Sequence, residues 1–64
     1  MATRVLQGLD QVELARLTAL RHARQAVDSL RRDDLTGMDI DDAYENLRSA
    51  LNEARAVKRW HESQ

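Results

Sequence analysis

The chain is 64 residues long, contains no cysteine and no proline, and carries a formal net charge of -1. Such a chain is expected to form a single domain over residues 1–64 that is barely stable alone, and no disulfide or thiolate metal site can add to its stability. The balanced charge argues against a general attraction to nucleic acid. The lack of a long apolar run argues against a membrane span or a secretory signal, so we expect a cytoplasmic protein.

The predicted class is all-α, because the chain has one tyrosine, one tryptophan and no phenylalanine, and its apolar residues follow helical spacing. Asp10 and Glu13 are spaced like a capping box, which predicts a first helix over about 11–32. Its apolar residues recur at steps of three and four: Val12, Ala15, Ala19, Ala23, Ala26, Val27 and Leu30. Leu14 and Leu17 fall outside this stripe, and so wide an apolar arc indicates burial against more than one neighbour.

An acidic loop over 33–38 separates this helix from a second one, predicted over about 39–61. Asp39 is expected to cap its first turn, and Asp41 and Asp42 lie where the positive end of the helix dipole favours carboxylates. The apolar stripe of this helix consists of Ile40, Ala43, Tyr44, Leu47, Ala50, Leu51, Ala54 and Val57. Because so short a connection normally makes two helices antiparallel neighbours, the prediction is a two-helix hairpin.

The predicted inner face of the hairpin is rich in alanine, with Ala15, Ala19, Ala23 and Ala26 opposite Ala43, Ala50 and Ala54. Alanines bury little area each, so we expect the hairpin to form a homodimer, a four-helix bundle that covers the remaining leucines. An antiparallel dimer would place the acidic end of one hairpin beside the basic end of the other. The alternative, which is favoured, is that these charges only complement the ends of the helices. In length and layout the hairpin resembles the Rop family, whose hairpins dimerise into a four-helix bundle that binds RNA.

Trp60 does not fall on the predicted stripe of the second helix, so packing within a simple hairpin does not account for it. Either Val5, Leu6, Leu9 or Leu14 covers it, or it is an exposed anchor for a partner. The predicted partner-binding surface is the open end of the hairpin, around Trp60, Arg59 and Leu14. Asp41 and Asp42, in the acidic region, form a second candidate surface.

Catalytic and metal-binding motifs are missing from the sequence. It has no cysteine nucleophile, no glycine-rich phosphate loop and no Glu-x-x-His motif, so we expect a protein that is not an enzyme and needs no metal or cofactor. A calcium loop with Gly37 at its sixth position would place Arg32 and Ala43 at ligand positions that need oxygen atoms. His22 has no carboxylate three or four residues away, so it is interpreted as an ordinary surface or rim histidine.

The function predicted from these features is that of a small interaction or regulatory protein, a helical-hairpin module that binds another protein. The alternative is a Rop-like regulator that binds RNA or DNA through Arg21, Arg24 and Arg31, which share one face of the first helix. Asp28 interrupts this row of arginines and no aromatic residue is interleaved for base stacking, so nucleic acid is the less favoured partner.

Overall fold

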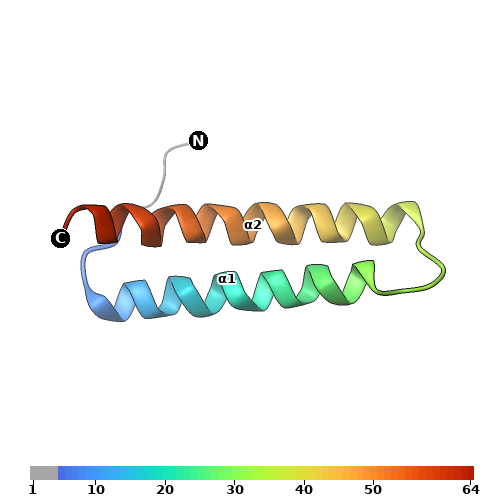
Figure 1. Ribbon diagram of the computed structural model, residues 1–64, viewed down its shortest axis with the longest axis horizontal. Helices are drawn as coiled ribbons and strands as arrows, with labels where there is room; N and C mark the ends of the chain where they lie inside the picture. The colour runs from blue at the N-terminus through green and yellow to red at the C-terminus, as the bar shows by residue number, and fades with distance from the viewer. Residues whose placement is uncertain (1–4) are drawn as a thin grey trace.

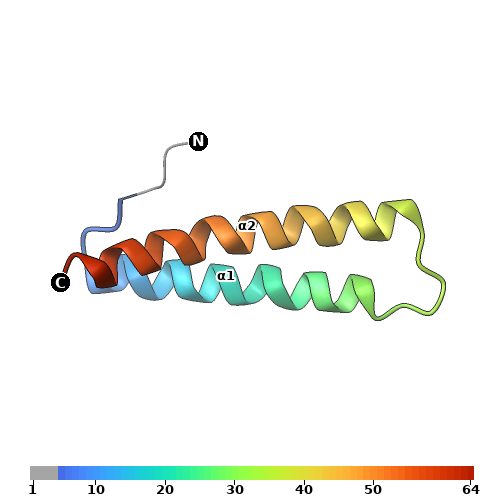
Figure 2. The same cartoon turned by 45° about the horizontal axis from the view of Figure 1, so that its top comes forward.

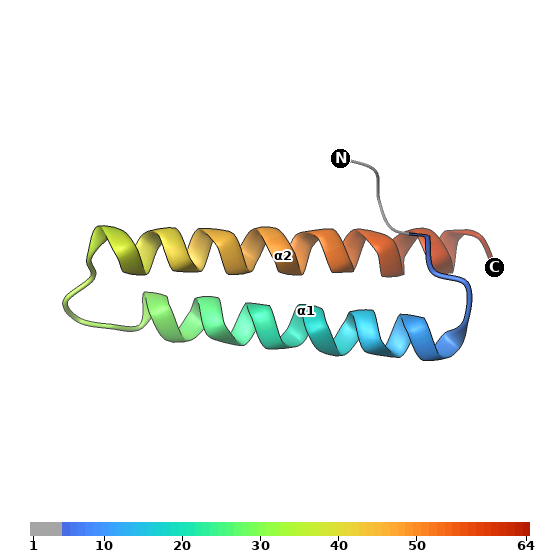
Figure 3. The same cartoon turned by 180° about the vertical axis from the view of Figure 1, so that it is seen from behind.

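Two long helices packed side by side make up the fold. The structure, a computed structural model, describes residues 5–64. Helix α1 spans Leu9–Leu30 and helix α2 spans Gly37–Glu62. The two run in opposite directions, with the connection at one end and the start of α1 beside the end of α2 at the other (Figure 1). Views from two further directions show the same arrangement (Figures 2 and 3), so the predicted all-helical hairpin is confirmed over the described residues.

Helix α1 begins two residues earlier than predicted, at Leu9. Its N-cap is Gly8, which has an extended backbone and no side chain to offer, so the predicted capping box of Asp10 and Glu13 is wrong. The Gln11 side chain accepts a hydrogen bond from the Gln7 amide (2.9 Å) and so satisfies a donor just before the first turn. Glu13 is engaged instead with Arg16, one turn further along.

Helix α2 also begins before the predicted position, because its cap is Thr36 rather than Asp39. The Thr36 hydroxyl accepts a hydrogen bond from the Asp39 amide (3.2 Å), and the Asp39 carboxylate accepts one from the Thr36 amide (3.1 Å), a reciprocal capping box. Arg32 donates to the other carboxylate oxygen of Asp39 at 3.2 Å. Asp39 is thereby buried with its charge compensated, and it ties the connection to the first turn of α2.

Replacing Thr36 with alanine removes the oxygen that caps the Asp39 amide. We expect the free energy of unfolding to fall by about 1 kcal/mol, the usual contribution of a helix N-cap. Urea denaturation followed by circular dichroism would measure the change. Thr36→Ser keeps the hydroxyl and should retain most of the stability, so equal losses in the two variants would contradict the role given to the cap.

The contact between the helices, here called the seam, is lined by small and polar residues. On α1 its buried or half-buried positions are Val12, Ala15, Ala19, His22, Ala26 and Ser29. On α2 they are Asp39, Ala43, Asn46, Ala50, Glu53, Val57 and Trp60. Steps of three and four along both runs are typical of a coiled-coil contact.

The seam is rotated from the stripes that hydrophobicity predicted. Ala54, expected inside, is exposed, whereas Ala56 is buried and was not expected to be. Leu47 and Leu51 keep 49% of their surface exposed although they lie on the most apolar stripe of α2. The reason is steric, because small side chains let two helices approach closely and leucines are left to the side of the contact.

Candidate interaction surfaces

One side of the hairpin presents a continuous row of half-exposed apolar residues, which we call the apolar face. It consists of Leu20, Ala23, Val27, Ile40, Tyr44, Leu47, Leu51 and Ala54. Near the middle of the hairpin an open groove of about 500 Å³ follows this face, with Ala19, Ala23 and Ala50 among the small residues that line it. The walls include Leu20, Leu47 and Leu51. Contiguous exposed apolar residues are a common feature of surfaces through which proteins associate, so this face is a candidate interaction surface.

Arg16 lines the groove and forms an ion pair at its edge with Glu13, at 3.0 Å between Nη2 and Oε2. The hydrogen bond from the Arg16 guanidinium, followed by its positive charge, lowers the pKa of the Glu13 carboxyl below its ordinary value. Both side chains remain accessible to water, so salt screens the attraction and the pair adds little to stability.

The lowered pKa of Glu13 can be tested directly by a carboxyl-carbon NMR titration. Because the folded-state pKa lies below the unfolded one, any stabilisation is present above the unfolded pKa and is lost as the pH falls through the folded pKa. Arg16→Gln should return the pKa of Glu13 toward its ordinary value. An unchanged titration curve in that variant would show that Arg16 is not the cause.

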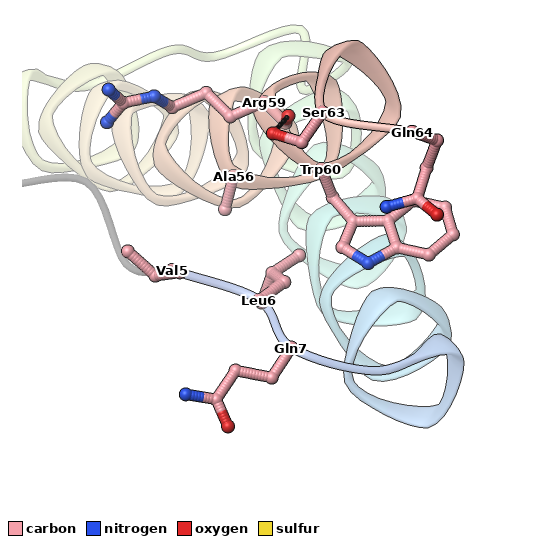
Figure 4. Close-up of a pocket in the computed structure, with 8 residues that line it drawn as sticks. All are labelled: Val5, Leu6, Gln7, Ala56, Arg59, Trp60, Ser63 and Gln64. Atoms are coloured by element: carbon pink, nitrogen blue, oxygen red, sulfur yellow. Dashed lines mark hydrogen bonds between the residues drawn. The ribbon is translucent and has the colours of Figure 1, made fainter.

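The open end of the hairpin holds a second surface, which we call the open-end pocket (Figure 4). Leu6 lies against the ends of both helices and forms a buried cluster with Val12, Ala15 and Ala56. Half-buried Val57 and Trp60 pack against this cluster. The pocket, about 380 Å³ in volume, is lined by Val5, Leu6, Gln7, Ala56, Arg59, Trp60, Ser63 and Gln64.

Trp60 is half-buried in the structure, so it is neither fully covered nor fully exposed. Of the four residues expected to cover it, Leu6 belongs to the buried cluster against which Trp60 packs, whereas Val5, Leu9 and Leu14 are well exposed. The indole also meets the ring of His61 edge to face, at 5.0 Å between ring centres. Trp60 therefore contributes to the small core and still reaches the wall of the pocket.

The predicted partner-binding residues are divided among three places. Arg59 and Trp60 come together in the open-end pocket, and Leu14 is exposed on α1 and does not line that pocket. Asp41 and Asp42 are exposed near the start of α2, at the opposite end of the hairpin. The structure thus joins two of the five residues in one hollow and separates the others.

The apolar face and the open-end pocket lie on opposite sides of α2. Ala54 lines the groove and Ala56 lines the pocket. Two residues correspond to about 200° around a helix, because each residue turns it by about 100°. One surface can therefore be covered while the other stays accessible.

The arginines of the alternative function, Arg21, Arg24 and Arg31, are all exposed on α1. Arg24 and Arg31 flank a shallow hollow in which Asp28 and Val27 also take part, and Arg21 lies outside it. A carboxylate in this position opposes the approach of phosphate groups. The arrangement offers no continuous row of cations along the helix.

His22 and Asn46 form a hydrogen bond across the seam, at 2.9 Å between Nδ1 and Oδ1. The Asn46 amide nitrogen donates to the Asp42 carbonyl (3.0 Å), so its oxygen is the atom that faces the histidine and the ring nitrogen Nδ1 is the donor. His22 is thus a half-buried rim histidine, and it has a hydrogen-bond partner on the other helix. Sequence reasoning missed Asn46 because it lies outside the most apolar stripe.

Within residues 5–64, no group of three or more His, Asp or Glu side chains is arranged to hold a metal ion. No helix in that range combines the length and apolar character needed to cross a membrane. The fold and its surfaces define a class, the two-helix hairpin with an exposed apolar face. Comparison with protein-family models, curated proteins and solved structures finds no match to this chain.

Proposed function

We propose that the protein is a non-enzymatic helical-hairpin binding module, and that two copies pack their apolar faces together as a four-helix bundle. The observation that carries the proposal is the contrast between the two sides of the helices. The seam is filled mainly with alanine and polar residues, while five of the larger aliphatic side chains stay half-exposed along the apolar face. A chain that had only to fold as a monomer would gain more by turning those leucines inward.

The free energy gained by burying the apolar face is large enough for two copies to associate. Leu20 is 41% exposed, and five other large residues of the apolar face are exposed to about half or more: Val27, Ile40, Tyr44, Leu47 and Leu51. Burying the exposed part of such a side chain contributes about 1 kcal/mol, so two copies would gain about 12 kcal/mol. The loss of translational and rotational freedom on association opposes this by about 4–15 kcal/mol. The dimer is therefore expected to form in a concentration-dependent way.

In this proposal the open-end pocket, on the other side of α2, is the surface that remains for a protein partner. Its apolar lining by Leu6 and Trp60, with Arg59 beside them, fits an apolar side chain of the partner. Tryptophan and arginine are the residue types that most often dominate binding energy at protein interfaces. The acidic residues Asp41 and Asp42 are then left for a second contact.

The test is the solution mass measured by light scattering over a range of protein concentrations. A dimer has twice the 7.3 kDa mass of the chain, about 14.6 kDa. A mass of 7.3 kDa at concentrations up to the millimolar range would refute the bundle. A monomer that binds RNA with an affinity that falls steeply with added salt would favour the alternative through Arg21, Arg24 and Arg31.

A further inference from the structure

Charge is unevenly distributed along the hairpin. The His22–Asn46 pair divides it into a loop half, residues 22–46, and an open half, residues 5–21 and 47–64. The loop half has seven carboxylates and three arginines, a net charge of -4. The open half has six Lys and Arg residues and four carboxylates, a net charge of +2. A single chain thus carries opposite charges at its two ends.

We propose that the two hairpins of the bundle run antiparallel, so that the loop half of each copy lies over the open half of the other. This inference rests on the proposed dimer and specifies its partner as a second copy in one orientation. Two identical hairpins related by a two-fold axis can pack the same face together in only two ways, with like ends together or with unlike ends together. The observations below favour the second arrangement.

Several charged side chains at each end have no ion-pair partner among the residues that the structure describes. At the loop end, Asp33, Asp34, Asp41, Asp42 and Glu45 are exposed and form no ion pair among residues 5–64. At the open end the same is true of Arg55, Lys58 and Arg59. The ion pair of Arg32 with Asp39 is the only one at the loop end in the described part of the chain, and it leaves the net charge unchanged.

Distance explains why a second copy can compensate these charges although the chain itself cannot. The hairpin is 45 Å long, several times the Debye length of about 8 Å at physiological salt, so its two ends hardly interact. Helices packed face to face lie about 8–10 Å apart, close to one Debye length. Like ends together would bring two charges of -4 to this separation, whereas unlike ends together would bring -4 next to +2.

A spin label tests the orientation, because the chain has no cysteine of its own and a single one can be introduced at will. Leu35→Cys places the label in the connection between the helices, outside the apolar face. The antiparallel dimer should give a distance between the two labels on the order of the 45 Å length of the hairpin. A parallel dimer should give about two helix spacings, roughly 20 Å.

A matched label at the other end makes the result decisive. Ser63→Cys should also give a long distance by itself, while an equimolar mixture of the two labelled variants should add a short one. A dimeric sample with a short distance between the labels at position 35 would overturn the antiparallel inference and leave the proposed dimer standing. A monomeric mass for the unlabelled protein would refute the dimer itself, and the antiparallel inference with it.

Discussion

Replacing Leu20 with glutamate is expected to convert the dimer into a monomer. Leu20 lines the central groove of the apolar face, and in the bundle a carboxylate at this position would be removed from water in both copies. Losing the leucine contact and removing water from a carboxylate costs about 2 kcal/mol in each copy, so two per dimer should raise the dissociation constant about a thousandfold. Light scattering should show the mass falling from about 14.6 to 7.3 kDa.

Leu14→Glu is the matched control, because it adds the same charge to the same helix six residues earlier. Leu14 is 62% exposed and lies about 120° around α1 from Leu20, away from the groove. Its substitution should leave the mass unchanged. If both variants lowered the mass equally, charge and not position would be responsible, and if Leu20→Glu stayed dimeric, the apolar face would not be the interface.

Replacing Leu6 with alanine is expected to cause the largest loss of stability from any single truncation outside the helices. Leu6 is only 7% exposed and joins the buried cluster that supports Trp60. Truncating a buried leucine to alanine typically lowers the free energy of unfolding by about 2–5 kcal/mol, a large share of the stability of so small a protein. Trp60 emission should shift to longer wavelength, because its ring gains contact with water.

The neighbouring residue provides the control for this substitution. Val5 is 76% exposed, and neither Val5 nor Leu6 belongs to a helix, so Val5→Ala removes methyl groups without a difference in helix propensity. Its effect on the free energy of unfolding should stay within about 0.5 kcal/mol. Equal effects of the two substitutions, or unchanged Trp60 emission in Leu6→Ala, would show that Leu6 does not cover the indole.

The two helices and their pairing could be predicted because apolar residues at steps of three and four are a strong signal and a short connection leaves few arrangements. The positions at which the helices begin were harder to predict. The sequence suggested a cap formed by Asp10 and Glu13 for α1 and by Asp39 for α2, whereas the caps are Gly8 and Thr36. Aspartate suits the first turn as well as the cap, so its position alone does not fix the start of a helix.

The rotation of the seam could not be predicted from hydrophobicity. The most apolar stripe of α2 runs through Leu47 and Leu51, whereas the seam runs through Asn46 and Glu53. A stripe shows which residues avoid water, but not whether the chain itself or another molecule covers them. This rotation also explains why Trp60 is half-buried, because Trp60 lies on the seam although it is off the apolar stripe.

Of the candidate sites, the sequence could indicate the open end because an unexplained tryptophan beside arginine is a strong interface signal. It could not show that Leu6 folds back over that end, since a short segment before a helix has no periodicity to read. Nor could it separate Leu14 from Trp60, because which side of α1 faces α2 depends on the seam. The placement of Asn46 against His22 depends on the same rotation.

The hydrogen bond between His22 and Asn46 has a consequence for how many ways this hairpin could be assembled. Alanines recur along the seam, so a slip of one helix along the other by three or four residues would again place small side chains opposite one another. Such a slip would set His22 opposite Ala43 or Ala50 and leave two polar groups without partners. The alanines make the helices fit in several alignments, and this one polar pair distinguishes the native alignment from its neighbours.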